Sequence, residues 1–374
     1  MGRMVTKIFS FFSGIGFLDL GFEDEGFEVV LVNELSEKFM DGYQHSRKVL
    51  GMKKPSYGYH LGGIQDISNE MDLSSIVKSE VQEGNIVGFI AGPPCPDFSV
   101  GGKNRGREGE KGILSLAYFD LIIKYSPDFF LFENVKGLWR TKRHRRFYEE
   151  LKERANHHGY HLTEKLANAL EYGVPQDRDR IILFGFKKTL LDSLGYDSSL
   201  ANENRIDFPW DKIIKYSMSE VAWCSWPDVD DFKEGAQLPK PTGIIEDLTV
   251  DYWFRKNAVH KHPNSIHGFK PRAGLAKFKI IPEGDDSKKS YKRLHRWRYS
   301  PTAAYGNNEV HLHPYKARRI TVSEALAIQS MPKDFELPGT MSLTAMFKGV
   351  GNGVPYLMAR GLAESLKAFL ESES

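Results

Sequence analysis

The sequence predicts an α/β protein with a doubly wound, Rossmann-like sheet and a second, smaller, irregular domain. Two observations predict this fold class. Short apolar runs alternate with stretches of helical length over residues 7–187, as in strands joined by covering helices. Over residues 189–300 neither the strand nor the helix period persists. Helical spacing returns near the C-terminus, so we expect the end of the chain to complete the first domain.

Five apolar runs are the predicted strands, and each is followed by turn residues or by a segment of helical length. They read KIFSFF, FEVVLVNE, NIVGFIAG, FFLFENV and RIILFGF, at residues 7–12, 27–34, 85–92, 129–135 and 180–186. Near the C-terminus, TVSEALAIQSM predicts a helix capped by Thr321 or Ser323. The run GVPYLMARGLAESLKAFLES predicts the final helix.

The 374 residues suffice for two domains of ordinary size. We expect one domain from residues 1–188 with 340–374. Residues 189–339 are expected to form the second, smaller domain. The final helix is expected to lie beside the first glycine-rich turn.

The composition is that of a soluble globular protein with a formal charge of +2, but its basic residues cluster. The segments KNRGRE, RTKRHRRF and KSYKRLHRWRY suit phosphate contacts, although each is also compatible with a solvated basic face. The two cysteines, Cys95 and Cys224, lack metal-ligand spacing. We expect no metal site, no disulfide framework and no membrane span.

Glycines follow the first strand in FFSGIGFLDLGF, where Gly14 and Gly16 let the backbone turn tightly beside a helix start. The spacing is not GxGxxG. Glu34 ends the second strand, where a carboxylate can bind the two hydroxyls of a ribose. These residues favour a nucleoside-containing cofactor, and alone they do not separate a dinucleotide from S-adenosylmethionine.

Two reactive side chains end neighbouring predicted strands. Cys95 follows two prolines in AGPPC, and Glu133 lies in LFENV. Open α/β sheets bind ligands at the carboxyl ends of their strands, so a nucleophile and an acid can meet there. Arg178 and Arg180, two residues apart, share one face and can offer guanidinium groups to a carbonyl or to Glu133.

Eight segments in order resemble the motifs of the DNA (cytosine-5) methyltransferases. They are FFSGIGFLDLGF, NE at 33–34, QDI at 65–67, GPPCPDFS, FENV, YGVPQDRDRIILFG, RRITVSEALAIQSMP and GNGV. The resemblance covers about residues 7–187 and 301–370 and leaves the middle of the chain unmatched. It implies a Rossmann-like methyltransferase fold that uses S-adenosyl-L-methionine.

The resemblance also implies roles for single residues. Cys95 is the implied nucleophile and Glu133 the acid, with Arg178 and Arg180 as further catalytic residues and the position of Arg180 holding the cytosine carbonyl. The implied cofactor-binding residues are Phe12, Ser13, Gly14, Gly16, Glu34, Leu35, Asp66, Ile67, Pro94, Leu114 and Asn352. The sequence departs from the family pattern at Ser10, usually acidic, Phe17, usually glycine, Leu35, often tryptophan, and Pro96, often glutamine. The first three departures touch the walls of the implied cofactor pocket.

By this resemblance, residues 1–188 with 340–374 are expected to form the catalytic and cofactor-binding domain, and residues 189–339 the target-recognition domain. The chain is expected to methylate C5 of cytosine in a specific duplex DNA sequence, through a covalent Cys95 adduct and a flipped base. We expect a monomer, in the bacterial cytoplasm with the nucleoid or in the nucleus if eukaryotic. A cognate restriction endonuclease is expected to act on the same site without direct contact.

Three alternatives remain open from the sequence. A transfer RNA cytosine-5 methyltransferase belongs to the same family, although Ser99 and the long middle region favour DNA. A dinucleotide oxidoreductase would leave Cys95 and the later motifs without a role. A non-catalytic DNA-binding relative would need neither Cys95 nor Glu133.

Overall fold

The computed structural model describes residues 5–94, 110–196, 206–305 and 309–372. Its centre is a seven-stranded sheet in the order β3-β2-β1-β4-β5-β7-β6. Every adjacent pair is parallel except the two made by β7, which runs antiparallel to both β5 and β6. The strands are β1 (Thr6–Phe11), β2 (Glu28–Glu34), β3 (Tyr59–Leu61), β4 (Ile86–Ala91), β5 (Phe129–Val135), β6 (Tyr160–Asn168) and β7 (Asp179–Lys187).

All five strands predicted from apolar runs are present. Two further strands, β3 and β6, lie at the two edges of the sheet. The helices of this part are α1 (Phe17–Asp24), α2 (Glu37–Val49), α3 (Ile67–Glu70), α4 (Leu73–Gln82), α5 (Glu110–Tyr125), α6 (Gly137–Arg140), α7 (Lys142–His157), η2 (Ala169–Tyr172), α8 (Lys188–Ser193) and the final α14 (Tyr356–Leu370).

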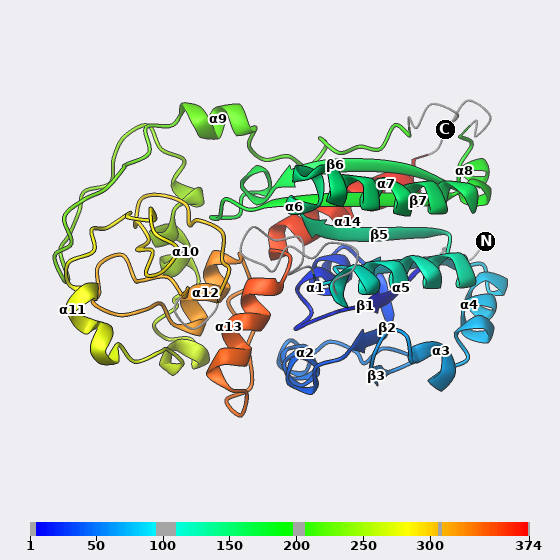
Figure 1. The fold of residues 1–374 in the computed structure, drawn as a ribbon, viewed down its shortest axis with the longest axis horizontal. Coiled ribbons are helices and arrows are strands. Elements are labelled where there is room, and N and C mark those ends of the chain that lie inside the picture. The colour runs from blue at the N-terminus through cyan, green and yellow to red at the C-terminus, as the bar shows by residue number, and fades with distance from the viewer. Residues whose placement is uncertain (1–4, 95–109, 197–205, 306–308, 373–374) are drawn as a thin grey trace.

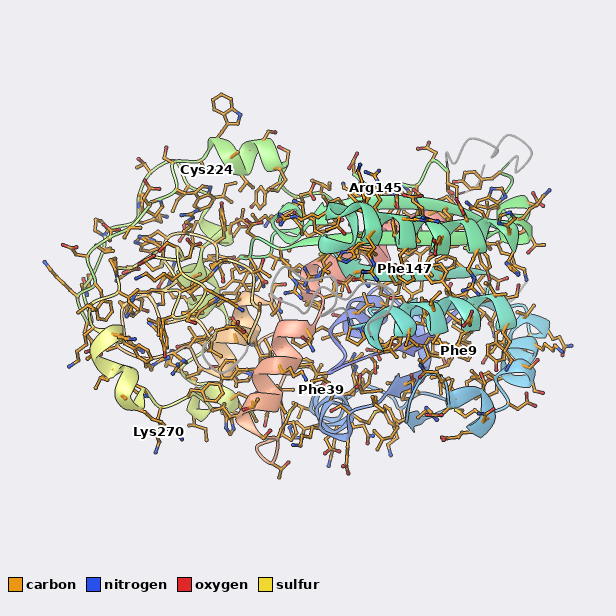
Figure 2. All side chains as sticks on the ribbon, in the orientation of Figure 1. Phe9, Phe39, Arg145, Phe147, Cys224 and Lys270 are labelled. Carbon is orange, nitrogen blue, oxygen red and sulfur yellow. The ribbon has the colours of Figure 1, made fainter. Side chains whose placement is uncertain are left out.

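Helices cover both faces of the sheet, as a doubly wound fold requires. Successive residues of a central strand point to opposite faces, so Ile8 joins the core under α1, α2 and α14 while Phe9 joins the core under α4, α5 and α7. Phe9 and Phe147, both labelled in Figure 2, belong to the second core. The central strands are therefore buried on both faces, which explains their continuous apolar sequence.

Helix α14 packs along α1, the helix that begins at the first glycine-rich turn. An ideal Cβ on Gly21 of α1 would lie 2.4 Å from the backbone nitrogen of Arg360 in α14. Arg360 also pairs with Glu25, the C-cap of α1, at 2.8 Å. The first glycine-rich turn and the final helix therefore belong to one packed unit.

The middle of the chain is irregular, with short helices and isolated bridges in the residues that the structure describes. In Figure 1 it lies at the left, beyond the ends of the strands, whereas α4 and α8 lie at the right, at the other ends of the strands. Its helices are α9 (Met218–Trp223), η4 (Glu246–Leu248), α10 (Val250–Lys256), η5 (Pro263–Ile266), η6 (Arg272–Gly274) and α11 (Leu275–Phe278), followed by α12 (Val322–Ile328) and α13 (Leu343–Asn352).

The predicted helix at TVSEALAIQSM is α12, and Thr321 is its cap. The Thr321 hydroxyl accepts from the Glu324 backbone, and the Glu324 carboxylate accepts from the Thr321 backbone, which is a capping box. A shared core joins α12 to α13 and to Phe17 of α1. This core crosses the boundary predicted at residue 339, and the division into two domains stays a prediction.

Within the described ranges, every helix is too short or too polar to cross a membrane.

Candidate active site

The glycine turn after β1 has the tight geometry that its sequence predicts. Gly14 and Gly16 both have positive φ, at 57° and 86°, a region that glycine enters at little cost. Phe12 also has a positive φ, at 53°, and such strain in a non-glycine residue is common near functional sites. Ser13 fixes the turn to β2, because its backbone N–H and its hydroxyl both donate to the Asn33 carbonyl, at 3.2 and 3.1 Å.

Glu34 lies at the end of β2 and closes the same turn. Its carboxylate accepts the backbone N–H of Gly14 at 2.8 Å and that of Ser36 at 2.8 Å. Burial raises the pKa of Glu34, and these backbone hydrogen bonds oppose the rise. A carboxylate has about four acceptor positions, so two remain for ligand hydroxyls. Next to it, Leu35 is 71% exposed and presents an apolar surface.

Two departures from the family pattern are accommodated by neighbouring side chains. Ser10 donates its hydroxyl to the Asp19 carboxylate at 2.8 Å, so a buried acid still lies beneath the turn, supplied by α1. Phe17 packs edge-to-face on Phe335, with ring centroids 5.2 Å apart. An ideal Cβ on Gly353 would lie 2.4 Å from the Phe17 ring, so only glycine fits there. The GNGV segment thus lies against the start of α1.

Glu133 and Arg180 form an ion pair at the carboxyl end of β5. Arg180 Nε lies 2.8 Å from Glu133 Oε1, and both side chains are about nine-tenths buried. The other carboxylate oxygen faces the loop after β4, since an ideal Cβ on Gly92 would lie 2.8 Å from Glu133 Oε2. Gly92 is three residues before Cys95, so the acid lies against the loop that leads to the cysteine.

Arg178 has different surroundings, although it was predicted together with Arg180. It is 1% exposed, and its guanidinium donates to the carbonyls of Gly351 and Gly353 at 3.0 Å each. Weaker bonds reach the carbonyls of Ala303 and Asn352. Burial lowers the pKa of this guanidinium well below its usual value. Arg178 therefore ties the start of β7 to the end of α13.

The other predicted residues differ in burial. Ile67 is fully buried, whereas Asp66 at the start of α3 is exposed. Leu114 of α5 packs on the core that contains β4 and β5. Asn352 ends α13 and is exposed. Pro94 is the last residue described before a gap, and the predicted nucleophile Cys95 lies outside the described residues.

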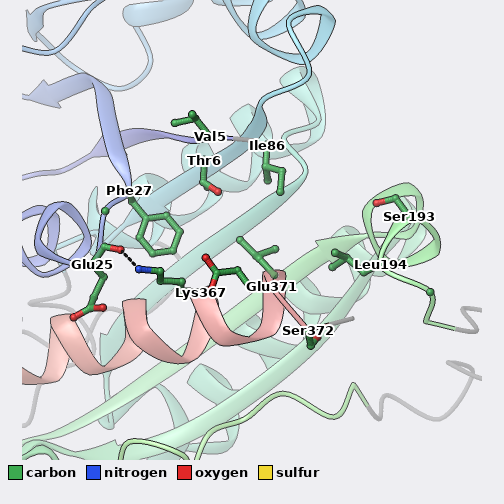
Figure 3. Close-up of a pocket in the computed structure, with 13 residues that line it drawn as sticks. Val5, Thr6, Glu25, Phe27, Ile86, Ser193, Leu194, Lys367, Glu371 and Ser372 are labelled. Atoms are coloured by element: carbon green, nitrogen blue, oxygen red, sulfur yellow. Dashed lines mark hydrogen bonds between the residues drawn. The ribbon is translucent and has the colours of Figure 1, made fainter. Parts of the chain in front are cut away.

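A cavity of about 820 Å³ lies at the opposite ends of the strands, where β1 and β4 begin. Figure 3 shows Thr6, Ile86 and Phe27 lining it together with Lys367 of α14, which donates to the Glu25 carbonyl. None of the predicted site residues lines this cavity. Ligands of open α/β sheets bind at the carboxyl ends of strands, so this cavity is separate from the candidate site.

Sequence reasoning missed several polar residues at the site. Gln176, fully buried, donates to the side-chain oxygen of Gln329, the C-cap of α12, at 3.0 Å and accepts the Ala303 N–H at 2.9 Å. Tyr43 and Arg47 of α2 lie beneath the glycine turn. The position of Gln176 before the paired arginines was a usable signal, whereas nothing in the sequence of α2 points to a turn that lies about 30 residues earlier.

Comparisons with known proteins agree with this geometry. The model of the C-5 cytosine-specific DNA methylase family matches residues 6–368. The type II methyltransferase M.NmeDI of Neisseria meningitidis serogroup C is 55% identical over 373 residues, which cover 99% of this chain and 85% of that relative. M.FnuDI of Fusobacterium nucleatum is 29% identical over 376 residues, covering 96% and 95%.

Solved structures share the fold. A DNMT2 variant from Spodoptera frugiperda superposes with a TM-score of 0.57 at 17% identity, covering 97% of this chain and 99% of that chain. The Dnmt2 methyltransferase of S. pombe superposes with a TM-score of 0.58 at 13% identity, covering 98% and 99%. At these identities the likeness concerns the fold alone. The family match over nearly the whole sequence decides the class: the chain belongs to the C-5 cytosine-specific DNA methylase family and is a DNA cytosine-5 methyltransferase.

Proposed function

We propose that the chain methylates C5 of a flipped cytosine in a specific duplex DNA sequence, with Cys95 as nucleophile and S-adenosylmethionine as methyl donor. The observation that carries the proposal is the Glu133–Arg180 pair at 2.8 Å, with the second Glu133 oxygen against Gly92. An acid and a guanidinium held together at the carboxyl edge suit the N3 and O2 atoms of a cytosine ring.

The chemistry follows from these groups. C5 of cytosine is a poor nucleophile, so the Cys95 thiolate adds to C6 while Glu133 holds a proton at N3 and Arg180 donates to O2. Electron density then gathers at C5, which accepts the methyl group. A base removes the C5 proton, and the C6–sulfur bond breaks to release Cys95 as thiolate. Because the target base is inside a duplex, it must first leave the stack.

The residues of the glycine turn fit an adenosyl cofactor. Glu34 keeps acceptor positions for ribose hydroxyls beyond its two backbone bonds, and the exposed Leu35 offers an apolar face to a base. When bound there, S-adenosylmethionine supplies an electrophilic methyl group. Phe12, Asp66, Pro94, Leu114 and Asn352 complete the proposed cofactor site, and Arg178 supports it by holding the Asn352 segment.

Duplex DNA is proposed to lie at the carboxyl edge of the sheet, facing the irregular region. Five cations follow β5 within a short distance along the chain, at Arg140, Lys142, Arg143, Arg145 and Arg146, and all are exposed. Such a cluster suits phosphate contacts. Residues 189–339 are proposed to read the sequence. Exchanging residues 189–297 for those of a relative of different specificity should transfer its methylation context, and an active chimera that keeps the original context would contradict this division.

The biological setting is proposed from the type II relatives. We propose a monomer in the bacterial cytoplasm, associated with the nucleoid, that protects the sites of a cognate restriction endonuclease without contacting it. The endonuclease and the methyltransferase would meet the same DNA sequence independently.

Bisulfite sequencing of DNA from cells that express the chain tests the proposal directly. We expect methylated cytosines confined to one short sequence, and none in cells expressing Glu133→Gln, because the amide keeps the shape but cannot supply the acid. Purified transfer RNA is the competing substrate. If transfer RNA is methylated and DNA is not, DNA is not the substrate and the proposal is wrong.

A further inference from the structure

A buried polar cluster lies beneath the glycine turn, and we call it the turn-support cluster: Ser10, Asp19, Glu23, Tyr43 and Arg47. The Asp19 carboxylate accepts the Ser10 hydroxyl at 2.8 Å and the Tyr43 hydroxyl at 2.9 Å. Glu23 accepts Arg47 Nε at 2.8 Å. These bonds join β1, α1 and α2 in a region without exposed side-chain surface, apart from the partly exposed Glu23.

Arg47 connects this cluster to the backbone of the turn. Its terminal nitrogen Nη2 donates to the Gly16 carbonyl at 2.7 Å, and the same carbonyl accepts the first helical bond of α1, from Leu20 at 3.1 Å. The guanidinium also lies 4.4 Å from the centre of the Tyr43 ring. A charged donor on a helix-capping carbonyl fixes where α1 begins.

The fit at Gly16 is tight. An ideal Cβ there would lie 2.7 Å from two carbons of the Tyr43 ring and 2.9 Å from Arg47 Nη2. Gly16 adopts a φ of 86°. The ring and the guanidinium therefore fill the space behind Gly16, whereas an ideal Cβ on Gly14 would meet nothing within 4 Å.

We propose that Tyr43 and Arg47 are positioning residues that set the affinity for the adenosyl cofactor by holding the turn from behind. The proposal rests on the proposed function, because it takes the cofactor to bind at this turn. Tyr43 is fully buried and Arg47 is 2% exposed, so both act through the backbone and neither reaches the ligand.

Hydrogen bonds within the turn connect Tyr43 and Arg47 to the groups proposed to contact the cofactor. Gly14 N–H donates to Glu34, the proposed ribose ligand, at 2.8 Å. Gly16 N–H donates to the Ser13 carbonyl at 2.9 Å, and this bond couples the positions of Ser13, Gly14 and Gly16. A displaced Gly16 therefore shifts the hydrogen bond that orients the Glu34 carboxylate.

Equilibrium binding of S-adenosylhomocysteine, measured by titration calorimetry without DNA, tests this inference. We expect Tyr43→Phe to weaken binding about fivefold and Arg47→Lys about tenfold or more, because each removes a bond to a charged or capping group. At saturating S-adenosylmethionine, kcat and the affinity for duplex DNA should stay within about twofold of the unmodified protein.

Tyr160→Phe is the matched control. It also removes a buried phenol hydroxyl, bonded to the Pro127 carbonyl at 2.7 Å, at a place remote from the turn. It should leave cofactor binding unchanged. If the unmodified protein binds no S-adenosylhomocysteine, the proposed function fails. If the unmodified protein binds S-adenosylhomocysteine and Tyr43→Phe binds it equally well, the positioning role is contradicted. Tyr43→Phe is the milder substitution, so it tests the proposal even if Arg47→Lys does not fold.

Discussion

The two arginines after Gln176 differ in their partners, although the sequence spaces them as equivalents. Arg180 pairs with the Glu133 carboxylate, whereas Arg178 donates to backbone carbonyls at the end of α13. The same substitution should therefore have different effects at the two positions, because Arg180 contacts a carboxylate in the site and Arg178 holds backbone segments together. Their spacing predicted a shared face, but only their partners separate their roles.

Methionine at each position separates these two roles. Arg180→Met should lower kcat by about two to three orders of magnitude, the cost of losing one donor to a developing charge, and should also lower the stability, because it leaves the buried Glu133 carboxylate without its partner. Arg178→Met should lower the free energy of unfolding by about 2–4 kcal/mol, because it leaves several buried carbonyls without a donor. Denaturant titration and single-turnover methylation measure the two effects. Near-normal methylation by folded Arg180→Met would contradict this assignment.

At the scale of elements, the packing of α14 on α1 ties the C-terminus to the glycine turn. The contact depends on Gly21, whose position allows the two backbones to approach closely. A helix beginning at the turn is held along its length by the last helix of the chain. This arrangement explains why a protein with a long irregular insertion still keeps its first and last motifs together.

Gly21→Ala tests the close approach. Alanine favours a helix by about 1 kcal/mol over glycine, but its Cβ would meet the backbone of Arg360 at 2.4 Å. We expect the clash to dominate and the free energy of unfolding to fall by about 1–3 kcal/mol. Gly339→Ala is the control, since an added Cβ there meets nothing closer than 4.0 Å. Stabilisation by Gly21→Ala would show that the helices separate without cost.

The elements differ in how well sequence predicts them, and burial explains the difference. The five predicted strands are mostly apolar because helices cover both faces. The missed strand β6 is only partly buried and has Glu164 and Lys165 in its middle, and β3 has only three residues at an edge. The glycine turn and Glu34 were predictable from local chemistry. The turn-support cluster was not, because Asp19 and Arg47 meet only after α1 and α2 pack.

For the whole molecule, the irregular region is held partly by buried polar groups whose charge state depends on pH. Burial lowers the pKa of His311 to about 3 and that of His313 to about 3. Lys292 lowers the pKa of His311 further. At His313, Glu324 opposes the shift, and neighbouring lysine and arginine side chains add to it. In the unfolded chain, histidine has a pKa near 6.5.

Acid should therefore destabilise the folded protein through these two rings. Below about pH 6.5 the unfolded chain binds protons that the folded chain does not bind until about pH 3, so stability present at neutral pH is lost as the pH falls through this window. Each ring should cost about 2 kcal/mol at pH 5 relative to pH 7. Denaturant titrations at both pH values measure this difference.

His311→Gln should reduce the pH 5 to pH 7 difference by about 2 kcal/mol. The exposed His260 is the control, and His260→Gln should leave the difference unchanged. An unchanged difference in His311→Gln would mean that this ring is protonated in the folded protein.

The central claim is that Cys95 bonds covalently to the target cytosine. The test uses a duplex that carries the recognised sequence with 5-fluorocytosine at the target position. Fluorine takes the place of the C5 proton whose loss releases Cys95, so the adduct persists. We expect a complex that survives denaturing electrophoresis in the presence of S-adenosylmethionine, with the modified peptide containing Cys95. Cys224→Ser should form it equally well, since Cys224 lies in the irregular region near α9, away from the sheet (Figure 2). Failure to form the adduct on DNA that the enzyme methylates would contradict the account.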